Sequence, residues 1–350
     1  MRKTVGPLAA ALLTVPALAA CGAQAGDDAD LTVVASFYPV AFVSERVAGD
    51  LATVDVLSRP GTDAHDLELT PQQIASVQDA DVVVYQSGFQ AAVDDAVAAA
   101  DRDDATVVDS AEGVDPVADD ADGHDHESDD DHGEDHGDHG DHGDHGDDSH
   151  DDHDHDHGDD EHSHEDEADD HSDHDHGPND PHLWLDPANM VELTRSVESA
   201  LATADPDNAE TYAANAEALV EELETLDTDF AEGVATCERR DIVVSHAAFG
   251  YLAGAYDLEQ IAINGLDPSN EPSAAQLAQI SDLVQDEDIT TVFTERLVSS
   301  AVADTVAREA GVETAVLDPV EGLTDETADE DYISLMRQNL EAITQANDCS

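Results

Sequence analysis

Residues 205–234 read DPDNAETYAANAEALVEELETLDTDFAEGV, and this stretch decides the fold. Asp205 and Pro206 are typical of a helix start, and a helical pattern rich in Ala, Glu and Leu then continues to about Val234. A helix of this length exceeds what one compact lobe needs. We therefore interpret it as a rigid connector between two lobes. The predicted divisions are an N-terminal lobe at 31–205, a linker helix at 206–235 and a C-terminal lobe at 236–350.

Strand patterns and helix patterns alternate on both sides of this connector. Strands are predicted at 31–35, 54–57, 81–85, 106–108, 242–245, 259–263, 290–294 and 314–317. Helices are predicted at 40–48, 71–78, 89–100, 187–203, 248–256, 273–286, 299–310 and 330–346. Such alternation predicts an α/β fold in which each lobe is a mostly parallel sheet with flanking helices. Ligands of open α/β sheets bind beyond the carboxyl ends of the strands, so we expect a site in the cleft between the lobes.

The charge of the chain restricts its partners. The formal net charge is −74, from 85 Asp and Glu against 11 Lys and Arg in 350 residues. A nucleic-acid partner is excluded because it requires a basic surface, and attraction to anionic lipid headgroups is excluded for the same reason. The acidity favours a cation as ligand. It also suggests a salty external medium, where salt screens the repulsion between carboxylates.

The first residues read as an export signal. A basic start at Met1–Lys3 and a short apolar run to Ala20 describe a signal peptide over residues 1–20. The Cys that follows Leu-Ala-Ala resembles a bacterial lipobox, which implies that Cys21 carries lipid and that residues 21–30 are a tether. We therefore expect an extracytoplasmic protein anchored to the cell membrane. In such a protein, the two remaining thiols, Cys237 and Cys349, are expected to form one disulfide.

Histidine is distributed very unevenly. Sixteen of the 19 His lie within residues 117–177, and the other three are His65, His182 and His246. Each of these three follows a predicted strand or lies in a loop, where a site is expected. Three neutral imidazoles from separate segments suit Zn²⁺ or a similar divalent ion. Carboxylates that are near in sequence and could hold the second ring nitrogen are Asp63, Asp66 and Asp186.

The segments around these histidines resemble a known family. They read Gly61-Thr-Asp-Ala-His65-Asp-Leu-Glu68-Leu-Thr70-Pro71, Asp180-Pro-His182-Leu-Trp184-Leu-Asp186-Pro187 and Ser245-His246-Ala-Ala-Phe249-Gly-Tyr251-Leu252. Three further matches follow in order: Glu271-Pro272-Ser273, Phe293-Thr294-Glu295 and Leu317-Asp318-Pro319. Together they resemble the metal-specific solute-binding proteins of bacterial ABC importers, the ZnuA-like or TroA-like receptors, over about residues 31–346.

The resemblance implies both a function and a ligand set. It implies a high-affinity receptor, not an enzyme, that captures Zn²⁺ between two lobes and delivers it to a membrane permease with its ATPase. It implies that His65, His182 and His246 are ligands and that a carboxylate or water is the fourth. By its motif Asp318 is the expected carboxylate, with Glu295 as the second choice. We also expect a monomer.

The tract at 117–177 has a chemistry of its own. Its Asp-His-Gly repeats cannot form a core, so we expect disorder and weak binding of several divalent cations. The resemblance adds that such an insertion is characteristic of zinc-type receptors. The expected weak sites are His124, His126, His132, His136, His139, His142, His145, His150, His153, His155, His157, His162, His164, His171, His174 and His176.

Three other functions remain open from the sequence. A zinc hydrolase would also use three imidazoles, although no His-Glu-x-x-His pair is present. A surface zinc buffer or adhesin would need the lipid anchor but no transporter. The same receptor fold could instead be tuned to manganese, against which the third histidine and the His-rich tract argue.

Overall fold

The computed structural model describes residues 31–100, 102–117, 179–270 and 272–350. The elements of the N-terminal lobe are β1 (Leu31–Ala35), α1 (Tyr38–Ala48), β2 (Ala52–Val56), α2 (Pro71–Asp79), β3 (Val82–Tyr85), α3 (Ala91–Ala99), β4 (Val107–Asp109) and α4 (Pro187–Ala204). The long helix α5 (Ala209–Val234) follows. The C-terminal lobe contains β5 (Asp241–Val244), α6 (Gly250–Tyr256), β6 (Glu259–Ala262), α7 (Ala274–Asp286), β7 (Thr291–Thr294), α8 (Ala301–Ala310), β8 (Glu313–Val316) and α9 (Tyr332–Ala346).

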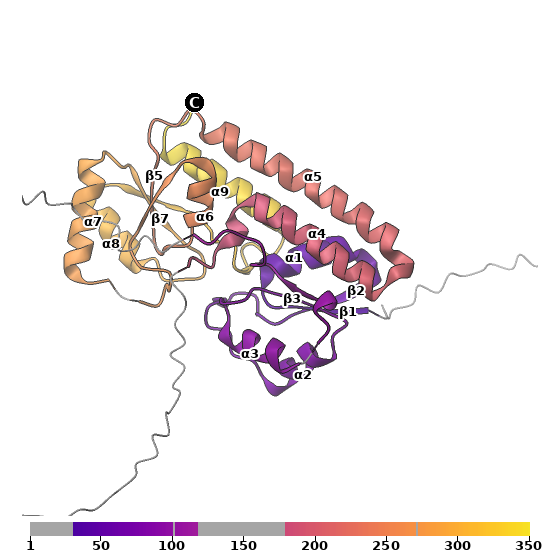
Figure 1. Cartoon of the computed structure of the whole chain (residues 1–350). Coiled ribbons are helices and arrows are strands. Elements are labelled where there is room, and N and C mark those ends of the chain that lie inside the picture. Colours follow the sequence, from indigo (N-terminus) through magenta and orange to yellow (C-terminus); the bar gives the residue numbers. More distant parts are fainter. Residues whose placement is uncertain (1–30, 101, 118–178, 271) are drawn as a thin grey trace, which may run out of the picture.

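Each lobe contains one four-stranded sheet, and the two sheets have the same strand order. The orders are β2-β1-β3-β4 and β6-β5-β7-β8, and all neighbouring strands are parallel. The register places Val33 beside Val82 in the first sheet and Val243 beside Val292 in the second. The predicted two-lobed α/β fold is confirmed (Figure 1). Element ends lie within two residues of the predictions, except that the first turn of the connector is a separate 3-10 turn at Pro206–Asn208.

Each sheet is covered by helices on both faces, and successive side chains of a strand pack into the cores on opposite faces. In β1, Val33 and Ala35 face the large core that contains α1 and α4, while Val34 faces the smaller core under α2 and α3. In β5, Val244 faces the large core and Val243 faces the core under α7 and α8. Because successive strand side chains point to opposite faces, apolar runs such as these predict sheets covered on both sides.

The helix α5 belongs to the core of both halves. It packs along α1, α4 and α9, with Leu219, Leu223 and Leu226 fully buried. One continuous apolar cluster therefore reaches from Val33 in the first sheet to Met336 in α9. Figure 1 shows α4, α5 and α9 along one side of the molecule. The division of the chain at 205/206 and 235/236 remains a prediction.

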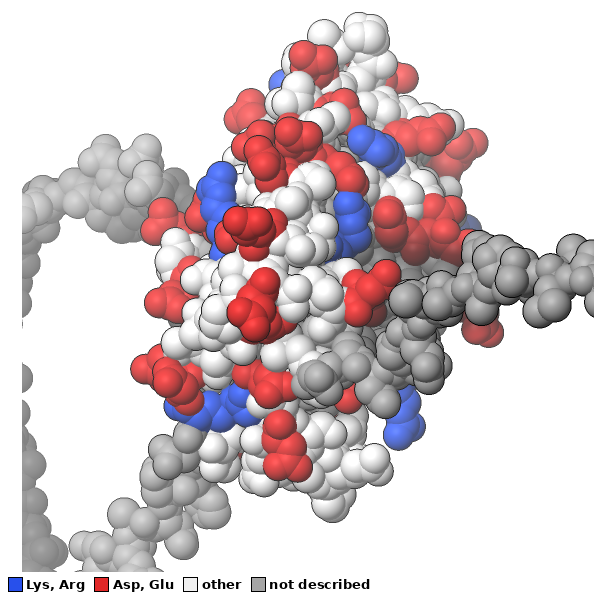
Figure 2. All heavy atoms as spheres, turned by 90° about the vertical axis from the view of Figure 1, so that its right-hand side faces the viewer, with Lys and Arg blue, Asp and Glu red and all other residues white. Residues whose placement is uncertain are grey.

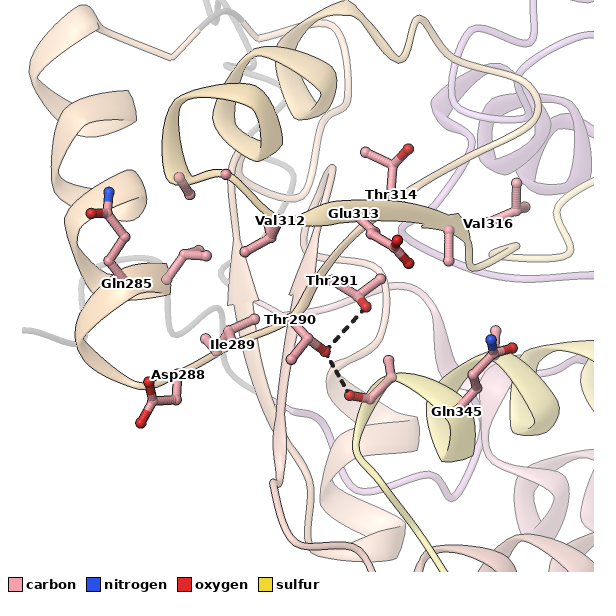
Figure 3. A pocket seen from close by; sticks show the side chains of 16 residues that line it. Gln285, Asp288, Ile289, Thr290, Thr291, Val312, Glu313, Thr314, Val316 and Gln345 are labelled. Carbon is pink, nitrogen blue, oxygen red and sulfur yellow. Dashed lines mark hydrogen bonds between the residues drawn. The ribbon is translucent and has the colours of Figure 1, made fainter.

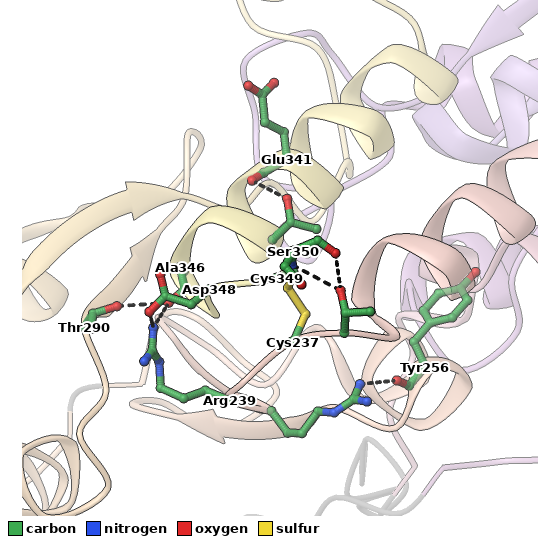
Figure 4. Close-up of a disulfide and its surroundings, with 12 residues drawn as sticks. Cys237, Arg239, Tyr256, Thr290, Glu341, Ala346, Asp348, Cys349 and Ser350 are labelled. Carbon is green, nitrogen blue, oxygen red and sulfur yellow. Dashed lines mark hydrogen bonds and ion pairs between the residues drawn. A yellow bond between two sulfur atoms is a disulfide. The ribbon is translucent and has the colours of Figure 1, made fainter.

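A disulfide joins the C-terminal tail to the segment before β5. The sulfur atoms of Cys237 and Cys349 are bonded, as predicted from the cysteine count (Figure 4). Around them, Thr236 Oγ1 donates to the Ser350 carbonyl at 2.7 Å, and Arg239 donates to the Ala346 carbonyl at 2.8 Å. The tail is therefore held by covalent and polar contacts together.

The surface carries many more carboxylates than guanidinium groups. Figure 2 shows Asp and Glu spread over the face formed by the right-hand side of Figure 1, with scattered Arg between them. Among the described residues, no helix is long and apolar enough to cross a membrane. The predicted signal peptide, the tether with Cys21 and the sixteen tract histidines lie outside the described residues.

Candidate metal centre

Four side chains from four separate segments meet between the lobes. They are His65 in the loop after β2, His182 just before the 3-10 turn that leads into α4, His246 two residues after β5, and Glu321 in the loop after β8. One ligand atom of each lies within 4.8 Å of all the others. The structure thus brings together the three histidines that the sequence singled out. Three of the four segments follow the carboxyl ends of strands, where ligands of open α/β sheets bind.

Five of the six distances between the four ligand atoms are close to the edge lengths of a tetrahedral zinc site. The Nε2 atoms of His65 and His246 lie 3.2 and 3.3 Å from His182 Nε2. Glu321 Oε1 lies 3.5, 3.6 and 3.7 Å from the Nε2 atoms of His65, His182 and His246. Metal–ligand bonds of about 2.0–2.1 Å give a tetrahedron with edges of about 3.3–3.4 Å. One ion of that size therefore fits between the four atoms.

Three of the four side chains of the centre are almost completely buried, and that of His65 is partly exposed. The side chains of His182, His246 and Glu321 are 0%, 1% and 3% exposed, whereas that of His65 is 16% exposed. Glu321 Oε1 is buried without a hydrogen-bond donor in the described part of the chain. A buried carboxylate oxygen without a donor is costly unless a cation satisfies it. The donor set thus favours a metal, and His65 marks its entry side.

Two carboxylates orient two of the imidazoles. His182 Nδ1 donates to Asp180 Oδ1 at 2.7 Å, and His246 Nδ1 donates to Glu295 Oε1 at 2.8 Å. Because a carboxylate only accepts, these contacts keep a proton on Nδ1, so Nε2 is the nitrogen that the neutral ring offers to the centre. His65 is held differently: its backbone N–H donates to Asp63 Oδ1 at 2.8 Å, and its ring packs edge-on against Phe89.

The carboxylate that completes the cluster is not the one predicted from the sequence, and its place is the fourth corner of the tetrahedron. Glu321 occupies it, whereas Asp318 pairs with Arg296 Nε at 3.0 Å and accepts the Val320 N–H at 2.8 Å. Glu295, the second choice, is the hydrogen-bond partner of His246. Asp318 thus shapes the loop that carries Glu321 and does not itself join the group. The sequence signal for Glu321 was its place three residues after Asp318 in the same loop.

The carboxylates expected beside the rings are also corrected in part. Asp63 contacts the main chain of His65, and Asp186 accepts the Ala188 N–H as the N-cap of α4. Neither carboxylate holds a ring nitrogen, and no hydrogen bond joins Asp66 to an imidazole among the described residues. Asp180, which does hold one, stands in the quoted motif two residues before His182.

The charges of the site are strongly coupled. Burial lowers the pKa of His182, but the hydrogen bond that its ring donates to Asp180 and the negative charges of Asp180 and Glu321 outweigh burial and raise that pKa to about 9. Burial raises the pKa of Glu321, but the imidazoles of His182 and His65 hold it well below its usual range. The carboxylate is therefore ionised, and the centre attracts positive charge. A metal ion must displace a proton from His182 to bind there.

Direct hydrogen bonds join the two lobes around the centre. The Gly61 N–H, in a turn with φ of 75°, donates to the Leu323 carbonyl at 2.8 Å and so links the His65 and Glu321 loops. Trp184 Nε1 donates to the Pro319 carbonyl at 2.7 Å, and Tyr332 OH donates to the Trp184 carbonyl at 2.6 Å. These bonds fix loops from both lobes relative to each other.

A hollow lies away from this centre. It measures about 940 Å³ and is formed by α7, α8, β7, β8 and α9 in the C-terminal lobe (Figure 3). Its described lining includes the carboxylates of Asp288 and Glu313 and the hydroxyls of Thr290 and Thr291, but no imidazole. This hollow is not a candidate site for a transition metal, because its described lining lacks the imidazoles that suit such an ion.

Two α/β lobes that enclose three imidazoles and one carboxylate are the architecture of a two-lobed protein that could hold one metal ion. A family model described as "ZnuA: Zinc-uptake complex component A periplasmic" matches residues 33–346. The chain belongs to this family.

Named relatives and solved structures agree with this family. The chain is 34% identical over 333 residues to the zinc-binding lipoprotein AdcA of Streptococcus pneumoniae (strain ATCC BAA-255 / R6), covering 95% of this chain and 58% of that protein. It is 33% identical over 316 residues to the high-affinity zinc uptake system protein ZnuA of Bacillus subtilis (strain 168), covering 89% and 86%. The Zn(II)-bound ZnuA-like domain of S. pneumoniae AdcA superimposes with a TM-score of 0.67 at 31% identity, over 91% of this chain and 99% of that domain. The chain thus spans somewhat more than half of AdcA.

Proposed function

We propose that this protein is an extracytoplasmic zinc receptor that binds Zn²⁺ between its lobes and delivers it to an ABC permease and its ATPase. In this proposal His65, His182, His246 and Glu321 are the ligands, and Cys21 carries the lipid that holds the protein at the membrane. The names of the relatives support zinc as the cargo. The observation that carries the proposal is the close approach of four donor atoms, two of which lie on imidazole rings that Asp180 and Glu295 orient.

The donor set favours zinc over manganese. Three of the four ligand atoms are imidazole nitrogens, and only Glu321 supplies oxygen. Imidazole suits zinc, whereas manganese favours sites rich in carboxylate, carbonyl and water oxygens. We therefore expect Zn²⁺ to displace Mn²⁺ from the site in a direct competition.

The same geometry argues against a zinc hydrolase. A catalytic zinc has three protein ligands and an open position for water, whereas four protein ligands close the tetrahedron. The group here supplies four donors, and three of their side chains are almost completely buried. A receptor that excludes water and holds the ion fits this arrangement.

Calorimetry on single variants tests the ligand set. His65→Ala, His182→Ala and His246→Ala should each lower the affinity for Zn²⁺ at the tight site at least about a hundredfold, because a four-ligand site loses one bond and its geometry. His142→Ala in the tract is the matched control and should leave the tight site unchanged. Unchanged tight affinity in all three site variants would show that the cluster is not the zinc site.

Two further experiments address the tract and the transporter. Deletion of residues 118–177 should retain one tight site and remove the weak ones, and loss of the tight site would contradict the proposed division.

Deletion of the gene in its own bacterium should reduce ⁶⁵Zn uptake at low external zinc. Uptake equal to that of the parent strain would instead favour a surface buffer or adhesin.

A further inference from the structure

Two ligands of the N-terminal lobe lie on irregular loops that no sheet ladder supports. His65 lies in the connection between Val56 and Pro71, and His182 lies before the short turn Leu183–Leu185. Asp180 orients the His182 ring, yet a tetrahedral site also requires that the main chain of both loops be fixed. One short segment, residues 86–90 between β3 and α3, contacts the main chain of both loops next to the histidines.

We infer that Gln86 and Gln90 are positioning residues of the proposed zinc site. Gln86 Nε2 donates to the Pro181 carbonyl at 2.5 Å, and Gln90 Nε2 donates to the Ala64 carbonyl at 2.8 Å. Each glutamine therefore binds the peptide group directly before a histidine ligand. A main-chain carbonyl only accepts, so the amide nitrogen must face it in both cases. Both glutamines are 2% exposed, so water does not compete for these bonds.

The segment that carries the two glutamines is itself anchored. Ser110 Oγ donates to Gln86 Oε1 at 3.3 Å, the Ser87 N–H donates to Asp109 Oδ1 at 2.9 Å, and the Gly88 N–H donates to Asp94 Oδ2 at 3.0 Å. The Gln90 carbonyl accepts from the first turn of α3. Between the two glutamines, the ring of Phe89 packs edge-on against His65, with centroids 4.8 Å apart. The segment is therefore a rigid support for both loops.

The two lobes use the same topological position for this purpose. Gln86 directly follows β3, and Glu295 directly follows β7, which occupies the equivalent place in the second sheet. Glu295 accepts from the ring Nδ1 of His246 at 2.8 Å and from its backbone N–H at 3.2 Å. The residue after the third strand of each lobe thus holds a histidine segment. In the C-terminal lobe, Glu295 binds both the ring and the main chain of His246. In the N-terminal lobe, Gln86 binds the main-chain carbonyl before His182.

The inference rests on the proposed function and is tested with Gln86→Leu, Gln90→Leu and the double variant. The zinc affinity of each single variant should fall about ten- to hundredfold, the usual effect of removing an outer contact of a metal ligand. The Co²⁺-loaded variants should also lose intensity in the visible absorption bands that report tetrahedral geometry. The stoichiometry of the tight site should remain one, because every ligand is still present.

Controls separate positioning from general destabilisation and from failure of the zinc assignment. Val77→Ala, in the core under α2, lowers stability without touching the centre and should leave the Co²⁺ spectrum unchanged. If a leucine variant does not fold, Gln86→Asn and Gln90→Asn keep the amide but are too short to reach, and they should show the same losses. Wild-type affinity and spectrum in the folded double variant would overturn the inference. Absence of tight zinc binding by the wild type would instead overturn the proposed function.

Discussion

At the scale of single residues, the loop from Asp318 to Glu321 shows how two nearby carboxylates acquire different roles. Asp318 accepts the Val320 N–H and pairs with Arg296, while Glu321 points into the centre. Val320, between them, is fully buried with φ of 56°. A branched residue is strained in this region and persists there only because its surroundings enforce it. The loop thus holds a strained backbone directly before the proposed ligand.

Glu321→Gln and Asp318→Asn separate a ligand from a loop support. The first variant removes the only anionic donor of the cluster, so zinc affinity should fall about a hundredfold or more. The second keeps an oxygen for the Val320 N–H and loses only the charge beside Arg296, so affinity should change less than about tenfold. Titration against a competing chelator measures both. A larger loss for Asp318→Asn than for Glu321→Gln would restore the ligand expected from the motif.

Zinc binding should also depend on pH in a defined direction. Burial lowers the pKa of His182, but Asp180 and Glu321 outweigh it and raise that pKa to about 9, so the metal-free protein holds a proton there at neutral pH. Zinc must release it, and affinity should therefore fall up to about tenfold for each pH unit below 9. Calorimetry in buffers of different ionisation enthalpy should show about one proton released from this ring at pH 7 to 8. The Asp180→Asn variant should release less, and release unchanged by that substitution would contradict the assignment.

At the scale of elements, the start of α6 meets the segment that carries His182. A Cβ on Gly250 would collide with Asp180 Oδ2, whereas a Cβ on Gly254 in the same helix would meet nothing within 4 Å. Asp180 N–H also donates to the Val117 carbonyl at 2.8 Å, and Tyr251 OH accepts the Val117 N–H at 3.4 Å. The first turn of α6 is therefore part of the support of the metal centre.

Gly250→Ala and Gly254→Ala form a matched pair in this helix. Alanine is favoured over glycine in a helix by roughly 0.5–1 kcal/mol, so Gly254→Ala should raise the free energy of unfolding slightly and leave zinc affinity unchanged. Gly250→Ala should displace the Asp180 carboxylate and lower zinc affinity about tenfold or more. Denaturation with urea and zinc titration of both variants measure these effects. Equal zinc affinity of the two variants would show that the close approach of Gly250 to Asp180 is not needed.

At the scale of the whole molecule, one apolar core joins the two lobes, and one disulfide closes the C-terminal lobe. The apolar cluster along α5 is continuous from the first sheet to α9, and the Cys237–Cys349 bond closes a loop with a sequence separation of 112 residues around the second sheet. The metal centre lies away from that disulfide, in the loops at the carboxyl ends of the strands. Global stability and zinc affinity should therefore respond to different substitutions.

Loss of the disulfide should destabilise the fold without changing the site. The Cys237→Ser/Cys349→Ser double variant should lose roughly 2–5 kcal/mol in free energy of unfolding, since a long loop is no longer closed in the unfolded chain. Zinc affinity should remain within about threefold of the wild type. Chemical denaturation with zinc chelated, with and without reductant, measures the first effect. A wild-type denaturation midpoint that does not shift with reductant would contradict it.

The amino-acid sequence by itself determined the two α/β lobes, the strand and helix positions, the cysteine pair and the three histidines that meet. These follow from short-range periodicity and from the chemistry of scarce residues, because only three histidines stand outside the acidic tract. Tertiary structure alone decided that Glu321 and not Asp318 completes the group, that Asp180 and Glu295 orient the rings, and that Gln86 and Gln90 hold the loops. The reason is that carboxylates and amides are abundant in this chain, so their roles depend on which loops approach one another in space.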